Sequence, residues 1–432
     1  MRWPMVPLGA IAEIIGGSTP SRETADYWGG SIPWVTPTDL PMPGKGIAAL
    51  KDTAEKITEH GLASSSTTLL PMGAVLFSSR ATIGKLAIAD VPVATNQGFA
   101  NFIPSPAVFN RYLAWALQFH TPNIERLAGS TTFKEVTKTA LKAFRIPLPP
   151  LSEQRRIAEM LDQADRLRRL RAEADKKAER ILPALFIKMF GDPILLVNVK
   201  ENVPLGDLEV DFQNGFACGE KDVDGGAPHL RMNNIDDSGV LNLELIRTVP
   251  NDRNTDRYRL LERDLLFMGT NSEEKVGKTC LFLPPDDRTY LFSNHLIRLR
   301  VRDSRITPEY LAAFLHLLWS KTFFPSIAKR WVNQASVAQS SLTAVRIPLP
   351  PAEPLQVFTR AYRGLLSLRA QWTYSGKEIS RIFTVLLHRA FSGQLTATWR
   401  EAHMKELLAE LEQQAKLLNL PPPSAERIAA EA

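Results

Sequence analysis

A six-residue stretch of this chain, RIPLPP at residues 145–150, occurs a second time, unchanged, at residues 346–351. Shorter matches keep nearly the same offset of about 200 residues: VPLG at 6–9 recurs at 203–206, and YLA at 112–114 recurs at 310–312. Solenoid repeats are only about 20–45 residues long, so this much longer period indicates a duplicated domain. We therefore predict two halves with the same fold.

The segments that follow the two copies, residues 151–190 and 352–392, are each expected to form a long helix of about 60 Å. Ser152 is a suitable N-cap residue with Glu153 in the first turn, and Pro183 should interrupt the first helix near its end. Apolar or small residues recur at 3-4 spacing in the first helix, and the same seam returns 201 positions later.

Two arrangements of these helices are open. Each helix could cover only its own domain, or the two could pack on each other. The equal length and matching seams of the two segments favour pairing. If the paired helices run antiparallel, the two domains would lie at opposite ends and be related by a pseudo-two-fold axis. DNA-reading dimers use such symmetry to place two readers roughly one helical turn, about 34 Å, apart.

The two globular halves, residues 1–150 and 191–351, are expected to be α+β. Short β-like runs alternate with turns, for example IPWV at 32–35, AVLF at 74–77 and LIRLRV at 296–301. Each half also contains one clear helix, about 110–119 in the first and 309–319 in the second. Thr307 and Pro308 are expected to be the N-cap and first residue of the latter.

The last segment, residues 393–432, extends beyond the repeat. Its apolar residues recur at helical spacing, and a run of three prolines at 421–423 ends the pattern. One interpretation is a short amphipathic helix that binds a partner, followed by a flexible tail. The other is a helix that packs back on the helix pair of the same chain.

Composition is typical of a globular protein, with 44% hydrophobic and 23% charged residues among 432. The formal net charge of +6 permits nucleic-acid binding but argues for it only weakly. Two cysteines, Cys218 and Cys280, have neither a disulfide framework nor zinc-ligand spacing around them, so we predict no metal site. No stretch is long and apolar enough for a signal peptide or a membrane span, and we expect a cytoplasmic protein without a membrane partner.

Polar clusters in the expected loops carry the side chains that read base edges and clamp phosphates. The candidates for DNA binding in the first half are Ser78, Ser79, Arg80, Thr82, Lys85, Asn96, Gln97, Thr131, Thr132 and Lys134. Those in the second half are Arg231, Asn233, Asn234, Asn271, Lys275, Lys278, Asn294, His295, Arg330, Trp331 and Asn333. Taken singly, each cluster fits an ordinary solvated loop better than a DNA contact, but corresponding clusters in both halves strengthen the set.

No catalytic motif stands out. A phosphate-binding P-loop, a glycine-rich dinucleotide motif and a paired-histidine zinc motif are all missing from the sequence. We therefore predict no catalytic residue in this chain. Two other classes stay open: an enzyme whose site is formed only in three dimensions, and a scaffold that uses the helices for assembly and does not bind DNA.

Together these features resemble the specificity subunits of type I restriction-modification enzymes, from Val6 to about Thr396. The resemblance rests on the order of several motifs: VPLG, RIPLPP twice, SEQ at 152–154, LRMNNI at 230–235, DLLF at 264–267 with VGK at 276–278, MFGDP at 189–193 and AFSGQL at 390–395. Two departures are the missing Glu-Gln start of the second helix, where the chain reads PAEPLQ at 351–356, and the extra residues 397–432.

The resemblance implies the following organisation. Each half would be a target-recognition domain that reads one part of a split, asymmetric DNA site, and the helices would set the spacer. The chain would also dock two methyltransferase subunits and, through the complex, restriction subunits. S-adenosylmethionine, ATP and Mg²⁺ would bind those partners, and no cofactor is expected on this chain. The target sequence and the spacer length do not follow from the sequence.

Overall fold

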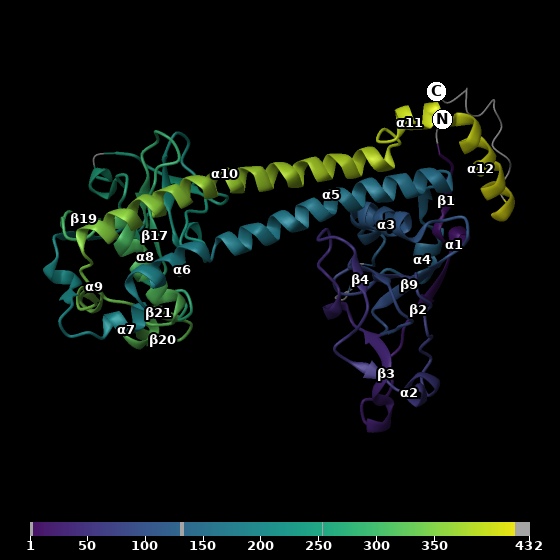
Figure 1. The fold of residues 1–432 in the computed structure, drawn as a ribbon, viewed down its shortest axis with the longest axis horizontal. Helices are drawn as coiled ribbons and strands as arrows, with labels where there is room; N and C mark the ends of the chain where they lie inside the picture. The colour runs from purple at the N-terminus through teal and green to yellow at the C-terminus, as the bar shows by residue number, and fades with distance from the viewer. Residues whose placement is uncertain (1–2, 130–133, 253, 420–432) are drawn as a thin grey trace. The chain divides into compact units, whose positions relative to one another are not determined.

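The computed structural model describes residues 3–129, 134–252 and 254–419 (Figure 1). By its internal contacts the chain forms two compact units: unit 1 is Met1–Arg171 with Gly376–Ala432, and unit 2 is Ala172–Ser375. Both divisions fall inside long helices. Each unit therefore contains one α+β domain together with parts of both helical segments.

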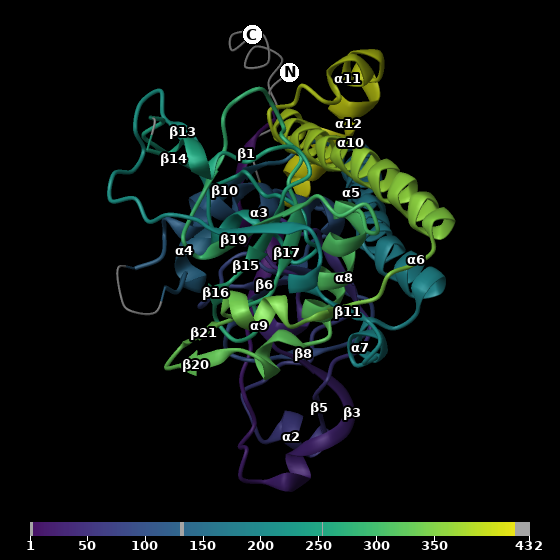
Figure 2. The ribbon, with the colours of Figure 1, turned by 90° about the vertical axis from the view of Figure 1, so that its left-hand side faces the viewer.

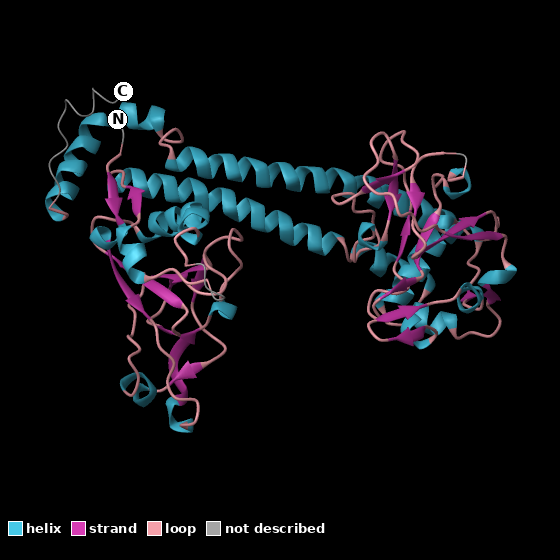
Figure 3. Ribbon diagram, turned by 180° about the vertical axis from the view of Figure 1, so that it is seen from behind, coloured by secondary structure: helices cyan, strands magenta, loops and turns pink. Residues whose placement is uncertain are grey.

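Unit 1 is built on a five-stranded sheet in the order β2-β9-β6-β7-β4, next to a three-stranded sheet β5-β3-β8 (Figure 3). A separate pair, β1 with β10, joins the start of the chain to the first RIPLPP copy. The strands are Met5–Pro7 (β1), Ala12–Gly16 (β2), Trp28–Val35 (β3), Ala48–Leu50 (β4), Lys56–Ile57 (β5), Val75–Ser78 (β6), Leu86–Ala89 (β7), Ala94–Thr95 (β8), Phe99–Pro104 (β9) and Arg145–Pro147 (β10). The helices of this domain are Leu8–Ile11 (α1), Glu59–Ala63 (α2), Asn110–Glu125 (α3) and Lys138–Ala143 (α4).

Unit 2, several of whose strands are labelled in Figure 2, repeats this topology. The strand orders confirm the predicted duplication. Its sheets β12-β19-β15-β17 and β14-β13-β18 correspond to β2-β9-β6-β7 and β5-β3-β8, and a third sheet, β16-β21-β20, is added. The strands are Val203–Pro204 (β11), Val210–Asn214 (β12), Ala227–Leu230 (β13), Arg247–Val249 (β14), Leu265–Met268 (β15), Thr270–Asn271 (β16), Thr279–Leu281 (β17), Leu291–Phe292 (β18), Leu296–Val301 (β19), Lys329–Trp331 (β20), Gln334–Ser336 (β21) and Arg346–Ile347 (β22). The helices are Pro193–Val197 (α7), Pro308–Ser320 (α8) and Gln339–Thr343 (α9).

The RIPLPP stretch is a structural motif in both units. Its isoleucine, Ile146 or Ile347, is fully buried in a short strand pair. A buried tyrosine of the domain helix donates its hydroxyl hydrogen to the backbone just beyond: Tyr112 to Pro147 O at 2.7 Å, and Tyr310 to Pro348 O at 3.1 Å. In both units the stretch thus lies where the chain leaves the domain and enters the long helical segment.

The predicted helices are present, with two corrections. Thr307 caps α8 as predicted, since its side chain accepts a hydrogen bond from Tyr310 N. The helix predicted at 110–119 continues to Glu125. Ser152 is not an N-cap: α5 (Leu151–Ala178) already begins before it, and the Ser152 N–H donates to Glu410 Oε2 at 2.9 Å.

The first long segment is two helices rather than one. The α5 helix ends at Ala178 and α6 (Ile181–Phe190) follows, so the chain breaks just before Pro183, as the prediction for that proline requires. The second segment is one uninterrupted helix, α10 (Ala352–Phe391). Pro354 lies in its first turn, where a missing N–H costs little.

Within each unit the two helical segments run antiparallel. In unit 1 the guanidinium of Arg168 in α5 lies 4.3 Å from the ring centre of Phe383 in α10, and Glu153 at the start of α5 contacts Thr396, which follows α10. In unit 2 Arg369 of α10 forms an ion pair with Glu179, which follows α5, at 3.5 Å. Of the two predicted arrangements, the one in which the two helical segments pack on each other is therefore correct.

The C-terminal end of each helical segment packs on the domain that the segment does not directly follow in sequence. Phe190 of α6 packs edge-on against Tyr310 of α8, with ring centres 5.1 Å apart. Phe391, at the end of α10, packs against Tyr112 of α3 at 5.6 Å and stacks on Phe119 at 5.0 Å. Aromatic burial of this kind holds the helix ends on the domain cores.

The last described residues form α11 (Ala397–Ala402) and α12 (Met404–Leu417), which pack back on unit 1. Arg400 donates to the buried carboxylate of Glu153 at 2.8 Å, and Gln414 donates to Ala107 O at 2.9 Å. Of the two interpretations, packing on the same chain is the one the structure shows. The flexible tail predicted beyond α12 lies outside the described residues from 420 onward.

Candidate nucleic-acid interface

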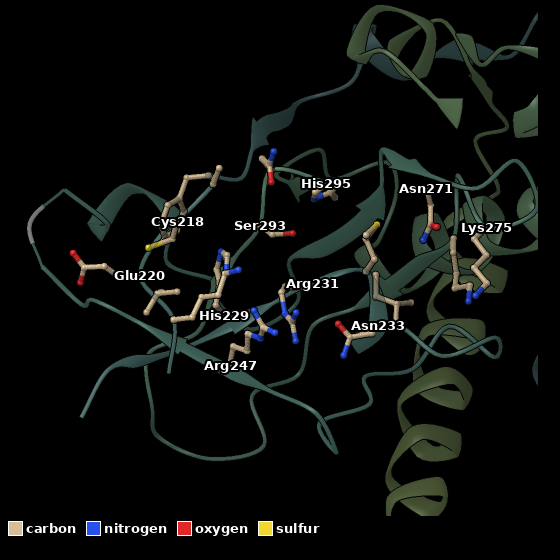
Figure 4. Close-up of a pocket in the computed structure, with 18 of the residues that line it drawn as sticks. Cys218, Glu220, His229, Arg231, Asn233, Arg247, Asn271, Lys275, Ser293 and His295 are labelled. Atoms are coloured by element: carbon tan, nitrogen blue, oxygen red, sulfur yellow. The ribbon is translucent and has the colours of Figure 1, made fainter. Parts of the chain in front are cut away.

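Unit 2 contains a cavity of about 660 Å³ where several loops meet (Figure 4). Seven of the side chains predicted to bind DNA line it: Arg231, Asn233, Asn271, Lys275, Lys278, Asn294 and His295. The sequence separates these residues into three clusters, and the fold brings the clusters to one site. Three further lining residues that bear on the chemistry, Phe216, His229 and Arg247, were not among the predicted contacts.

Strand order explains why the cluster at 231–233 meets the cluster at 294–295. The β13 strand ends at Leu230 and runs parallel to β18, with Leu230 opposite Phe292. Ser293 N donates to Leu230 O at 2.9 Å, so the turn at 293–295 lies directly beside Arg231. Parallel neighbours end at the same sheet edge, which is where loop residues from distant parts of a chain converge.

Asn234 has a structural role instead of the predicted contact with DNA. Its side-chain oxygen accepts a hydrogen bond from Arg231 N at 2.9 Å, and its amide donates to Asn242 O and Leu245 O. The side chain is buried, so the prediction of a surface contact was wrong. What Asn234 provides is the tight turn that presents Arg231 at the cavity.

Lys278 is also buried, and its ammonium group forms an ion pair with Asp237. The same hydrogen bond lowers the pKa of the Asp237 carboxyl. Lys278 therefore lines the cavity with its charge already matched. Lys278 is therefore not an exposed side chain that could bind a phosphate.

A fourth predicted cluster, Arg330, Trp331 and Asn333, forms an exposed β-hairpin. The strands β20 and β21 pair through Trp331 and Gln334, and Asn333 occupies the turn with φ of 64°. The indole of Trp331 is 59% exposed. Because β21 also pairs with β16 through Ala335 and Asn271, the hairpin is attached to the strand that reaches the cavity.

The cavity wall is electropositive around two arginines. Burial, and then the nearby guanidinium of Arg247, lower the pKa of Arg231, while Asp222 raises it to a smaller extent. His229, next along the wall, has its pKa lowered by burial. Neither His229 nor Arg247 belongs to a recognisable motif, but the strand register places Arg247 opposite His229.

In unit 1 the predicted residues split into exposed and buried ones. Arg80, Gln97 and Lys134 are exposed, and Thr82, Lys85 and Asn96 are partly exposed. Backbone hydrogen bonds from Ala81 to Lys134 O and from Ser79 to Gly98 O bring the three loops together. The fold thus gathers one polar surface from segments around 80, 96 and 134. Thr131 and Thr132 lie outside the described residues.

Ser78 and Ser79 are buried, so their prediction as DNA contacts was wrong. The Ser78 hydroxyl donates to Thr82 O at 2.6 Å and accepts from Lys85 N at 2.8 Å, which closes the loop between β6 and β7. Lys85 itself donates to Pro37 O at 2.6 Å. These residues shape the loop that presents Arg80 and Thr82.

Among the described residues no group of three or more His, Cys, Asp or Glu side chains is placed to hold a metal ion. Over the same part of the chain, no helix combines the length and the apolar character that a membrane crossing requires.

The fold and the site define a duplicated α+β protein with two loop-bearing domains and paired long helices. A family model for the type I restriction modification DNA specificity domain matches residues 2–180. The matched segment, less than half of the chain, is therefore similar to the specificity domain of type I restriction-modification systems.

Individual proteins of this kind are also similar to the chain. The chain is 37% identical over 190 residues to the type I restriction enzyme MjaIX specificity subunit of Methanocaldococcus jannaschii, which is 44% of this chain and 43% of that protein. The match thus spans less than half of the length of that relative. The chain is also 23% identical to the EcoKI specificity subunit of Escherichia coli, over 92% of this chain and 90% of that one.

A solved structure shares the fold. The S subunit of a type I restriction-modification system from M. genitalium superposes with a TM-score of 0.55 and 14% identity, covering 90% of this chain and 96% of that chain.

Proposed function

We propose that this chain is the DNA-recognition subunit of a type I restriction-modification complex, with residues 1–150 and 191–351 each reading one half of a bipartite, asymmetric DNA site. The observation that carries the proposal is the repeated topology with different polar side chains at the loop ends. The same scaffold twice, with different chemistry at each reading edge, suits a site whose two halves differ in sequence.

The helical segments 151–190 and 352–392 set the spacer between the half-sites and dock two methyltransferase subunits. Restriction subunits complete the complex. S-adenosylmethionine, ATP and Mg²⁺ act on those partners, and this chain supplies recognition without chemistry. The complex works in the cytoplasm, where its DNA is found.

The test is co-expression of this chain with a type I methyltransferase subunit from the same organism, followed by genome-wide mapping of methylated adenine with long-read sequencing. We expect one split motif with two short fixed parts and a constant gap. A complex that forms but methylates no motif would overturn the proposal and favour a scaffold. DNA turnover by the purified chain alone would favour an enzyme.

A further inference from the structure

Two polar atoms in the wall of the unit 2 cavity have no hydrogen-bond partner. They are Nε2 of His229 and Oγ of Ser293, whose side chains are only 5% and 4% exposed. Nε of Arg231, in the same wall, is also without one. A buried polar atom left unpaired costs about 1–3 kcal/mol, so three at one cavity indicate a site that is completed by a ligand.

The charge of the site is the second observation. Arg231 and Arg247 are close enough for one guanidinium to depress the pKa of the other, and among the described residues neither forms an ion pair with a carboxylate. Asp222 offsets part of the charge on Arg231, and Glu220 also lines the cavity. Two neighbouring guanidinium groups next to unpaired donors form a site for an anion.

Unit 1 offers an internal comparison, because β3, β5 and β8 repeat β13, β14 and β18. Trp34 pairs with Ala94 as His229 pairs with Leu291, so Trp34 stands where His229 stands in unit 2. Trp34 N donates to Glu55 O, which places Glu55 where unit 2 has Arg247. The residue opposite the aromatic ring is therefore positively charged in unit 2 (Arg247) and negatively charged in unit 1 (Glu55).

The unit 1 location is filled and neutral. Arg22 donates to Glu55 at 2.9 Å and lies 3.9 Å from the ring centre of Trp28 and 5.1 Å from that of Trp34. The first domain thus closes this place with its own ion pair and aromatic rings. The second domain leaves the same place open and positive.

We infer that the unit 2 cavity binds one backbone phosphate of the DNA, with Arg231 and Arg247 as its charge partners. Ser293 donates its hydroxyl hydrogen, and His229 donates from Nε2 in the doubly protonated imidazolium form that a bound anion favours. The inference rests on the proposed function and adds an asymmetry to it: this clamp belongs to the second domain only. A phosphate contact fixes the register of the domain on the duplex and does not read a base.

The first experiment uses the full chain in complex with its methyltransferase subunits and duplexes with and without the mapped motif. We expect R231Q and R247Q each to weaken binding about tenfold on both duplexes. The slope of log K against log salt should become shallower by about 1 for each variant. The double lysine variant, R231K/R247K, should keep the slope because it keeps both charges. R288Q, which removes an exposed charge from the same unit outside the cavity, should behave as wild type.

The second experiment places an uncharged methylphosphonate at each position of the motif duplex in turn. The DNA affinity of wild type should fall about tenfold when one particular phosphate in the second half-site is replaced. The affinity of R231Q/R247Q should not fall further at that position. A loss confined to the motif duplex with an unchanged salt slope would show base reading and overturn the inference, while motif methylation by wild type would still support the proposed function. The inference would also be overturned if R288Q weakened DNA binding as much as R231Q and R247Q do. The same holds if no single phosphate replacement reduced the affinity of wild type. Failure of wild type to bind any duplex would overturn both.

Discussion

At the scale of single residues, Glu153 holds the C-terminal helices to the first domain. Its carboxylate is fully buried and accepts hydrogen bonds from Trp3, Thr396 and Arg400 at 2.9, 2.6 and 2.8 Å. The three partners come from the start of the chain and from the region after α10. One carboxylate therefore ties both ends of the described chain to the beginning of α5.

We expect R400A to lower the free energy of unfolding by about 3–5 kcal/mol, because it leaves the Glu153 carboxylate buried without its cation. Denaturant unfolding of the full chain measures this loss. K405A, on the exposed face of α12, is the control and should stay within about 0.5 kcal/mol of wild type. A loss below about 1 kcal/mol for R400A would mean that the packing of α12, rather than the ion pair, holds this region.

His316 of α8 predicts a pH dependence of stability. Burial lowers its pKa to about 4, and the charged groups around it are Asp236, Lys278 and Arg369. The unfolded chain, with a histidine pKa of about 6.5, takes up the proton first. Stability from this group is therefore complete above pH 6.5 and falls by up to about 3 kcal/mol as the pH drops toward 4.

Comparison of unfolding curves of wild type and H316Q between pH 7 and pH 4 isolates this contribution. The variant should lose stability less steeply, since glutamine does not titrate. Parallel curves for the two proteins would contradict the assignment.

At the scale of elements, each domain helix is fastened to the long helix after it by an ion pair, with the charges exchanged between the halves. In unit 1 Arg111 of α3 pairs with Asp162 of α5 at 2.6 Å. In unit 2 Glu309 of α8 pairs with Arg363 of α10 at 2.6 Å, and also with Arg263 at 2.9 Å. This reversal of charge favours the native docking of each domain on the helix that follows it. If α3 docked on α10 at this point, Arg111 would face Arg363, and if α8 docked on α5, Glu309 would face Asp162.

D162R should therefore cost about 2 kcal/mol, since it places two arginines at a contact that is about 30% exposed and removes the acceptor of Trp115. R111E/D162R should recover about half of that loss, as Trp115 still lacks its partner. Thermal or denaturant unfolding gives both numbers. A double variant as unstable as the sum of the single ones would show that the pair has no coupling.

At the scale of the whole molecule, the proposed function makes the long helices the determinant of the gap in the DNA site. Inserting four residues within 160–180, together with four in the facing part of α10, should lengthen the spacer by about 2 base pairs, at ~1.5 Å per residue against 3.4 Å per base pair. Methylation mapping of the variant complex reads the new gap directly. R80Q serves as the control, because a loop change should alter one half-site and leave both the gap and the other half unchanged. An insertion that kept the gap would contradict the role of the helices.

Short-range features of the sequence were sufficient to predict much of the fold. The repeat of RIPLPP, the 3-4 seams, Thr307 before Pro308 and Pro183 are short-range features, and the duplication, the paired helices, the cap of α8 and the helix break followed from them. The resemblance to type I specificity subunits followed from the order of motifs. These features can be predicted because helix periodicity, capping and proline geometry depend only on near neighbours in the chain.

The tertiary structure alone decided the chemistry of the site. Arg247 meets Arg231 and His229 through strand register, and Glu55 takes the corresponding place in unit 1 through the same register, although no motif marks either residue. It also decided that Ser78, Asn234 and Lys278 face inward and that α12 returns to the first domain. Such outcomes depend on which distant segments share a sheet edge or a core, and the free energy of those contacts is not written in any local stretch of sequence.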